Sequence, residues 1–359
     1  MQKVYNRDTN VLQAARERIS YIFDNFEDIQ VSVSGGKDST VLLHLVLQEA
    51  AIRQRFVEVF FLDQEAEYKA TIDLMRKQMT LPFVIPKWYQ VPIYMTNATS
   101  YNDYFLYAWG ENEKWVREKE AIAIQEIKED YPKRFYEFFP YLEKKSPNKA
   151  YLIGLRADES MNRYRAVTKH GGYNDLKWST KTSSGANRFY PIYDMTFSDI
   201  WRFIYDYGIE YNRIYDYMFW NNHSIFNMRV SNLIHEKSYH CLKELAVFEP
   251  ETYDLLCQRI SGIATAARYA SERVMFSNRE LPKHYKCWKD FRDFLLENIP
   301  NESHKATFSQ RFERQEKNER TYKAQVKQLL IMDFENSTPF DTKKELRTNQ
   351  LKEKWNQIL

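Results

Sequence analysis

The chain has 359 residues, a length that fits one large or two moderate domains with a substantial core. Its 52 basic residues nearly balance 49 acidic ones, so the formal charge of +3 does not by itself indicate a nucleic-acid partner. Three well-separated cysteines without a Cys-x-x-Cys pair argue against a structural zinc site or a disulfide framework. Because the sequence also shows no signal-peptide pattern and no membrane-length apolar run, we expect a cytoplasmic protein.

Apolar residues at helical spacing predict a first helix over residues 10–26. A β-rich run over 29–33 follows and ends in the sequence Ser-Gly-Gly-Lys-Asp-Ser-Thr at residues 34–40. An apolar-periodic run then continues to about Ala50. The sequence therefore predicts a strand, a tight turn and a helix in succession.

The turn has the residue types that a phosphate-binding loop needs. Two glycines let the backbone bend sharply and approach a ligand, and the free amides and dipole at a helix start favour an anion. The lysine adds a positive charge and the hydroxyls add donors, whereas Asp38 either helps to hold a metal ion or stabilises the helix start. The predicted nucleotide-binding residues of the turn are Ser34, Gly35, Gly36, Lys37, Asp38, Ser39 and Thr40.

This turn does not have the Walker spacing, Gly-x4-Gly-Lys-Ser/Thr. It resembles the pyrophosphate loop of the PP-loop ATP pyrophosphatases, the superfamily that includes phosphoadenylyl-sulfate (PAPS) reductases, ATP sulfurylase small subunits and tRNA-modifying ligases. The resemblance implies an adenine-nucleotide alpha-hydrolase-like α/β fold, in which helices flank a Rossmann-like parallel sheet. A helical C-terminal region is expected to follow.

A second buried strand is expected over residues 57–63, and a helix then runs to about Met79. Asp63 ends this strand, and we expect it to be functional because open α/β sheets bind ligands outside such strand ends. In PAPS reductase-like proteins a Phe-x-Asp segment here lies over the nucleotide and usually continues with Thr-Gly. This chain has Gln-Glu instead, which argues against a reductase substrate, and Glu65 and Glu67 either serve the site or act as first-turn charges.

A third strand is predicted over residues 89–95. Residues 96–150 then depart from the α/β rhythm and are interpreted as an insertion rich in aromatic residues, with a charged helix over 114–129. The insertion is expected to cover the nucleotide pocket or to form a partner surface, although aromatic clusters more often belong to a core.

The next strand, over residues 151–156, leads into a second motif, Gly-x-Arg-x-x-Glu-Ser-x-x-Arg. The same pattern occurs at this place in PAPS reductases and their relatives. Its glycine leaves room beside a ligand, its arginines suit phosphate, and its glutamate can hold an arginine or bind ligand hydroxyls. The residues of this motif are Gly154, Arg156, Glu159, Ser160 and Arg163.

Residues 181–188 are expected to form a mobile loop. A helix capped by Thr196 or Ser198 follows and ends at Gly208, within a stretch that resembles the family pattern Trp/Phe-x-x-Asp-Ile/Val-Trp. We therefore place the nucleotide-binding domain at residues 1–235.

The remaining sequence predicts a helical domain at residues 236–335 and a charged helical tail at 336–359. Its motifs, together with Glu-Ala-x-Tyr at residues 65–68, resemble the immunoglobulin-binding regulator (IbrA-type) branch of the superfamily. That resemblance implies a ParB-like protein partner. The expected helices span residues 238–247, 250–271, 284–298 and 305–332.

A PAPS reductase needs a nucleophilic cysteine, normally in a Glu-Cys-Gly-x-His setting near the C-terminus. None of the three cysteines has that context. Cys241 follows His240, but adjacent residues of a helix do not face each other, so we interpret this cysteine as structural. Sulfonucleotide reduction is therefore an alternative rather than the leading hypothesis.

The leading hypothesis is a PP-loop enzyme that binds ATP with Mg²⁺, transfers AMP to an unknown acceptor and releases pyrophosphate. Asp38 and Asp63 are the candidate magnesium ligands, and Glu65 is expected to join the nucleotide site. The nucleotide is ATP or a relative such as PAPS. The candidate catalytic residues are Lys37, Asp38, Asp63, Arg156 and Arg163.

Three alternatives remain open at this point. One is a sulfonucleotide reductase that uses Cys241. Another is a nucleotide-binding regulator that acts with its partner and without turnover. The third is a nucleic-acid modification enzyme of the thiolation type, which would bind its nucleic acid in a strongly salt-dependent way.

Overall fold

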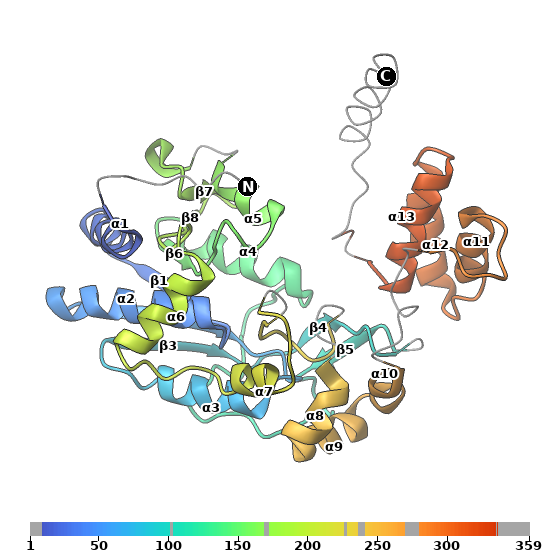
Figure 1. Cartoon of the computed structure of the whole chain (residues 1–359), viewed down its shortest axis with the longest axis horizontal. Coiled ribbons are helices and arrows are strands. Elements are labelled where there is room, and N and C mark those ends of the chain that lie inside the picture. Colours follow the sequence, from blue (N-terminus) through green and yellow to red (C-terminus); the bar gives the residue numbers. More distant parts are fainter. Residues whose placement is uncertain are drawn as a thin grey trace.

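The computed structural model describes residues 9–100, 103–168, 172–225, 228–235, 241–269, 280–334 and 336. In this part of the chain six strands form one sheet of order β3-β2-β1-β6-β8-β7, and two more form a separate pair (Figure 1). Neighbouring strands of the sheet are parallel except β7 and β8. The strands are β1 Ile29–Ser32, β2 Val57–Leu62, β3 Val84–Tyr89, β4 Ile93–Thr96, β5 Phe105–Ala108, β6 Ala150–Ile153, β7 Ser179–Lys181 and β8 Asn187–Phe189.

The order in which strands join the sheet reverses at β1. The chain first adds β2 and β3 on one side of β1 and later places β6 on its other side. The loops that leave the carboxyl ends of β1 and β6 therefore flank a topological switch point, where open α/β sheets bind their ligands. Both motifs found in the sequence occupy these two loops, and the predicted α/β fold with a mostly parallel sheet is confirmed.

Most of the expected helices up to residue 220 are present, and α6 shows how local sequence sets a boundary. Thr196 and Asp199 bond each other's backbone amides in a capping box, so Thr196 rather than Ser198 is the N-cap. The helices of this part are α1 Val11–Asn25, α2 Lys37–Arg53, α3 Lys69–Gln78, α4 Phe135–Lys145, α5 Met161–Thr168, α6 Phe197–Asp206 and α7 Ile214–Trp220, with a 3₁₀ turn at Tyr173–Asp175.

The strand expected over residues 89–95 is in fact two strands in different sheets. β3 ends at Tyr89, whereas β4 begins at Ile93 and pairs with β5. Pro92 lies between them and has no amide for a strand ladder, which explains the interruption.

The predicted helix over residues 114–129 is wrong. The segment is irregular and runs along the open edge of β3, where the Ile124 amide donates to the Trp88 carbonyl at 2.7 Å. The Ile124 carbonyl accepts from the Gln90 amide at 3.0 Å. The segment gains more free energy from these hydrogen bonds to the exposed edge of the sheet than its helix propensity would provide.

Residues 181–188 contain the ends of β7 and β8 and the turn between them rather than one long loop. The turn is attached to α4, because the Ser184 hydroxyl donates to the buried Glu143 carboxylate at 2.8 Å. Arg188 donates to the same carboxylate through Nε at 2.5 Å.

The C-terminal region is helical as expected, but two predicted helices are divided. Gly262, with φ of +93°, separates α9 from α10, and a Cβ there would lie 2.4 Å from the Thr99 carbonyl oxygen. Asn318 accepts from the Thr321 amide and so begins a new helix within the expected 305–332 run. The tail lies outside the described residues, except for residue 336. The helices described here are α8 Leu242–Phe248, α9 Pro250–Arg259, α10 Ile263–Tyr269, α11 Trp288–Glu297, α12 Glu302–Glu313 and α13 Glu319–Leu330.

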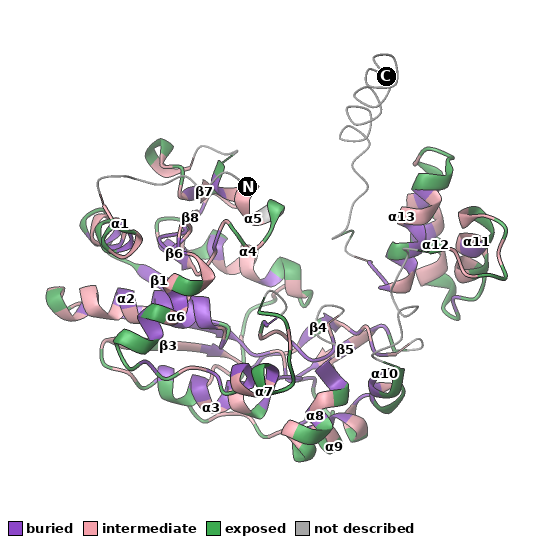
Figure 2. Ribbon diagram, in the orientation of Figure 1, coloured by how far each residue is buried: buried purple, intermediate pink, exposed green. Residues whose placement is uncertain are grey.

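Buried side chains form one cluster around the sheet, α1, α2 and α6, and a second that joins the β4-β5 pair to α7–α10 (Figure 2). A smaller cluster packs Tyr104 against residues of α12 and α13. Figure 1 shows α11–α13 grouped together, away from the sheet. Among the described helices, none combines the length and the apolar character needed to cross a bilayer.

Candidate functional site

The loop between β1 and α2 bends at Gly35. Its φ of +70° lies in the left-handed region, and a Cβ there would lie 2.7 Å from Thr71 Cγ2, so both the backbone and the space require glycine. Asn212 holds the bend, because its side-chain amide donates to the Gly35 carbonyl at 3.2 Å and to the Thr71 hydroxyl at 2.8 Å. α2 then starts directly after Gly36. The predicted sequence of strand, tight turn and helix is confirmed.

Some backbone amides of this loop donate hydrogen bonds within the protein, and others do not. The Ser34 amide donates to Ser39 Oγ at 3.2 Å, and the Lys37 amide donates to the Tyr215 hydroxyl at 3.0 Å. Within the described residues, the amides of Gly35 and Gly36 have no hydrogen-bond partner. Two donors therefore remain at the positive end of α2, where an anion is stabilised.

The two hydroxyl residues at the start of α2 face the protein. Ser39 Oγ donates to the Gly36 carbonyl at 3.0 Å and so stabilises the turn from within. Thr40 is fully buried and accepts from the side-chain amide of Gln78 in α3 at 3.1 Å. These contacts give Ser39 and Thr40 positioning roles, whereas Ser34 is exposed and shares a hydrogen bond of 3.3 Å with the Ser39 hydroxyl.

A buried charge cluster lies at the N-terminus of α2. Lys37 Nζ is 3.3 Å from Asp38 Oδ2, and Arg156 Nε donates to Asp38 Oδ1 at 2.6 Å. Burial lowers the pKa of Lys37, and the nearby Asp38 charge opposes that shift. Arg156 is 4% exposed and also bonds Asp158 at 2.6 Å, so its donors are directed at carboxylates of the protein. It is therefore placed to position Asp38 rather than to meet a ligand.

Arg163 lies nearer the solvent than Arg156. It forms an ion pair with Glu159, which also lies 3.8 Å from Arg156, and Ser160 Oγ accepts from the Arg163 amide at 3.2 Å. Burial, and then the charge of Arg229, lower the pKa of Arg163. Glu159 thus holds an arginine in position as expected, and Ser160 stabilises the start of α5.

The absence of a side chain at Gly154 makes room for backbone atoms of α2. A Cβ at this position would lie 2.8 Å from the Ser39 amide nitrogen and 3.0 Å from the Asp38 carbonyl carbon. The glycine therefore lets the end of β6 pass close to the first turn of α2. The sequence predicts that this space lies beside a ligand, whereas helix backbone occupies it instead.

Asp63 and Glu65 lie at the end of β2 but are enclosed. Both are fully buried. Asp63 accepts from the Trp88 and Gln90 side chains at 2.9 Å and pairs with Arg117. The sequence predicts both residues in the nucleotide site, whereas these contacts make them parts of a buried network.

Glu65 is held by three donors from two separate parts of the chain. It accepts from the amides of Trp109 and Val116 at 2.9 and 3.1 Å, both within the insertion. Arg259 of α9 donates to it through Nε at 2.8 Å. Glu65 therefore connects the insertion and the C-terminal helices to the end of β2.

The described residues do not fit a magnesium site of their own. In this part of the chain, no group of three or more His, Cys, Asp or Glu side chains is placed to hold a metal ion. Both carboxylate oxygens of Asp38 face cations, and those of Asp63 are surrounded by donors. Mg²⁺ needs several oxygen ligands, so an ion here would have to arrive with phosphate oxygens.

A cavity of about 670 Å³ opens at the carboxyl ends of β1 and β2, directly beside Ser34. One wall is aromatic and comes from Phe60 and from α4, and another is cationic. Its position agrees with the binding site expected at the switch point. The polar and charged lining residues are Ser32, Ser34, Gln64, Glu67, Thr96, Arg163, Arg188, Arg229, Ser231, Asn232 and His235.

Glu67 is the acid of this cavity. It is 5% exposed, and burial followed by the charge of Asp63 raises its pKa to about 8. A hydrogen bond with Asn232 opposes the shift. At neutral pH the side chain is therefore mainly a neutral carboxylic acid, which does not repel an anionic ligand.

The comparisons with known proteins agree with this geometry. Residues 28–221 match the family model of the phosphoadenosine phosphosulfate reductase domain. The chain belongs to this family. Residues 223–357 match a domain of unknown function, DUF3440. In Escherichia coli K12 the uncharacterized protein YbdN is 30% identical over 315 residues, which cover 82% of this chain and 76% of YbdN.

Solved structures share parts of the fold at low identity. The PAPS reductase of Candida auris, in complex with phosphate, covers 60% of this chain and 94% of its own, with 13% identity and a TM-score of 0.35. The FMN adenylyltransferase of Candida glabrata, in complex with FAD and pyrophosphate, covers 60% and 64%, with 15% identity and a TM-score of 0.38.

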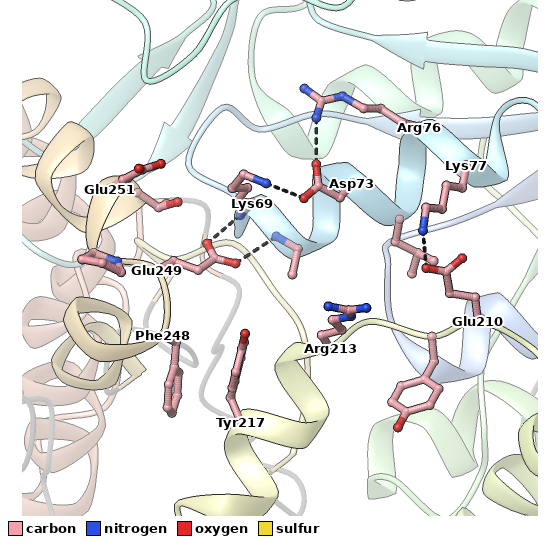
Figure 3. Close-up of a pocket in the computed structure, with 15 residues that line it drawn as sticks. Lys69, Asp73, Arg76, Lys77, Glu210, Arg213, Tyr217, Phe248, Glu249 and Glu251 are labelled. Atoms are coloured by element: carbon pink, nitrogen blue, oxygen red, sulfur yellow. Dashed lines mark hydrogen bonds and ion pairs between the residues drawn. The ribbon is translucent and has the colours of Figure 1, made fainter.

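A second cavity of about 680 Å³ lies among α3, α7 and the junction of α8 and α9 (Figure 3). Most of its charges are already paired: Lys77 bonds Glu210 at 2.5 Å, and Asp73 bonds both Lys69 and Arg76 at 2.7 Å. Tyr217 stacks on Phe248 along one side. The first cavity, with Arg229 unpaired among the described residues and with the free Gly35 and Gly36 amides beside it, is the better candidate for the ligand site of this PAPS reductase family member.

Cys241 does not have the environment of a reductase thiol. Its side chain is 5% exposed, and burial raises its pKa to about 11. A thiol of that kind stays protonated and is a poor nucleophile at neutral pH. This finding agrees with the structural role expected from the sequence.

Four residues of the site do not stand out in the sequence. Asn212 and Tyr215 lie in the stretch that resembles the family pattern, which by itself indicates mainly the fold. Glu67 fits a first-turn helix charge equally well, and Arg229 has no motif around it. Only the packing of distant segments brings these side chains to the loop.

Proposed function

We propose that this member of the PAPS reductase family binds an adenine nucleotide in the cavity beside the β1–α2 loop and transfers its AMP group to an acceptor. The polyphosphate would lie at the loop, with pyrophosphate as the leaving group. The observation that supports this most directly is the bend at Gly35, which leaves the Gly35 and Gly36 amides open at the start of α2 beside an electropositive cavity.

The proposed reaction is a substitution at phosphorus and needs no oxidant or reductant. An acceptor oxygen attacks the α-phosphorus, the bond to the bridging oxygen breaks, and the electron pair leaves with pyrophosphate. The acceptor proton passes to solvent. Lys37, the loop amides and Arg163 would stabilise the charge on the phosphates, and Asp38 and Arg156 would position Lys37. Magnesium would enter bound to the nucleotide.

Pyrophosphate release by the purified protein tests this proposal. We expect ATP to bind and a luminescent or radiolabelled assay to detect pyrophosphate once a suitable acceptor is supplied. Lys37→Ala should weaken ATP binding about tenfold or more, since it removes a charge-assisted contact. Arg213→Met, which changes a cation of the second cavity, is the matched control and should bind ATP normally.

Unchanged ATP binding in the Lys37 variant would count against the proposal, as would the absence of ATP binding by the wild-type protein. The environment of Cys241 disfavours sulfonucleotide reduction. Membership in the IbrA-type branch, the ParB-like partner and a nucleic-acid substrate stay predictions. Copurification followed by mass spectrometry would test the partner and the nucleic acid.

A further inference from the structure

We propose that Arg229 binds the phosphates of the ligand and that residues 228–235, at the start of the region matched by DUF3440, form one wall of the nucleotide cavity. This inference rests on the proposed function and deepens it. It gives the region of unknown function a part in the site itself, for ligands of the polyphosphate class.

The segment is firmly attached beside the end of β2. The Leu233 amide donates to the Ala66 carbonyl at 3.0 Å, and the Ala98 amide donates to the Ile234 carbonyl at 2.9 Å. Leu233 and Ile234 are fully buried, and Asn232 is 4% exposed. The cavity wall is thus held by the backbone bonds and the packing of the two residues that directly follow Asn232.

A direct connection runs from this segment to the phosphate loop. The Tyr215 hydroxyl accepts from the Lys37 amide at 3.0 Å, and the backbone amide of Val230 hydrogen-bonds the same hydroxyl. Tyr215 itself is 2% exposed. The residue next to Arg229 in the chain is therefore one side chain away from the start of α2.

Arg229 is a cation without a described anionic partner. Its side chain is exposed at the cavity, and within the described residues it has no ion-pair or hydrogen-bond partner. Burial is the main cause of the lowered pKa values of Lys37 and Arg163, and the charge of Arg229 adds to the lowering of both. Like charges within such reach repel each other, so an anionic group between them relieves the repulsion and binds favourably.

Other arginines near the cavity are already neutralised. Arg156 is bonded to Asp38 and Asp158, and Arg188 is bonded to the buried Glu143. Among the described residues, no such carboxylate pairs with Arg229, so its charge is available to a ligand. A guanidinium is also suited to phosphate oxygens because it presents paired, planar donors.

Isothermal titration calorimetry with ATP and with inorganic pyrophosphate tests the proposal on the full chain. We expect Arg229→Met to weaken the binding of both by about tenfold to a hundredfold, which is the range for a lost charge-assisted contact. Arg229→Lys should recover part of the loss. Arg213→Met is the matched control, because it removes a cation that likewise has no described partner and lies in the other cavity.

The outcomes separate the two proposals. If the wild-type protein binds ATP and Arg229→Met binds it within about twofold, the role of Arg229 is refuted while the proposed function stands. If pyrophosphate binds through Arg229 but ATP does not bind at all, the anion site stands and the nucleotide proposal fails. If neither binds the wild-type protein, both proposals fail. Equal losses in the Arg229 and Arg213 variants would show a general charge effect and would also refute the site.

Discussion

At the scale of single residues, the site combines polar groups that would be costly to bury alone. Lys37 and Asp38 are both nearly buried, and each is tolerated because the other and Arg156 lie beside it. Glu67, by contrast, is held mainly in its neutral form by burial. A buried acid of this kind makes the stability of the protein depend on pH.

We predict that replacing Glu67 by Gln removes part of that pH dependence. The pKa of this carboxyl is about 8 in the folded chain against an ordinary value of 4.5, so the folded chain keeps a proton that the unfolded chain loses between these values. The stabilisation is complete below pH 4.5 and is lost as pH rises to about 8, with a slope of up to about 1.4 kcal/mol per unit. Urea unfolding at several pH values would measure it, and identical slopes for both proteins would contradict the prediction.

Gly154→Ala tests the close approach of β6 to α2. The new Cβ would lie 2.8 Å from the Ser39 nitrogen, which belongs to backbone and cannot swing away, so we expect a loss of about 1–3 kcal/mol in unfolding free energy. Gly36→Ala is the control, because its Cβ would meet only side-chain oxygens at 3.4 and 3.6 Å. Equal unfolding free energies of the two variants in chemical denaturation would mean that β6 does not lie in tight contact with α2 at Gly154.

At the scale of elements, several contacts among the described residues attach the C-terminal helices to the sheet domain, and two of them involve carboxylates. Glu249 directly precedes α9 in the chain. Its carboxylate accepts hydrogen bonds from the backbone amides of Lys69 and Ala70 at 2.7 and 2.9 Å and so caps the N-terminus of α3 (Figure 3). An acid at that end of a helix also interacts favourably with its dipole. The second contact is the buried pair of Arg259 and Glu65.

Arg259→Met is expected to destabilise the protein by about 3–5 kcal/mol, because it leaves the fully buried Glu65 without its cation. The matched control is Arg202→Met, which breaks an exposed pair with Asp206 and should cost less than about 1 kcal/mol. Thermal and urea unfolding of both variants would measure the difference. A small effect at Arg259 would show that solvent reaches Glu65.

At the scale of the whole molecule, the two family regions share one core. The second hydrophobic cluster contains Leu62 and Tyr68 from the first region and Leu233, Leu242 and Ile263 from the second. Neither region can bury these side chains by itself. We therefore expect the chain to unfold as one cooperative structure across the boundary between the two family matches.

A chain that ends at residue 222 is expected to lose cooperative thermal unfolding and to aggregate. Truncation would expose the apolar side chains at the end of β2 and leave Glu65 without Arg259. Circular dichroism melts and gel filtration would test this, with a chain that ends at residue 336 as the control. A monomeric, cooperatively folded fragment would show that the first region is independent.

The sequence by itself determined the family, the α/β class and the glycine-bent loop between β1 and α2, because a glycine bend between a strand and a helix is a local property of a few adjacent residues. The motif at residues 154–163 is visible in the same way, although Gly154 and Arg156 serve the protein's own packing and charge balance. The tertiary structure alone decided the environments of Asp63, Glu65 and Arg229. Burial and ion pairing depend on segments that lie far apart in the chain, and no local pattern encodes them.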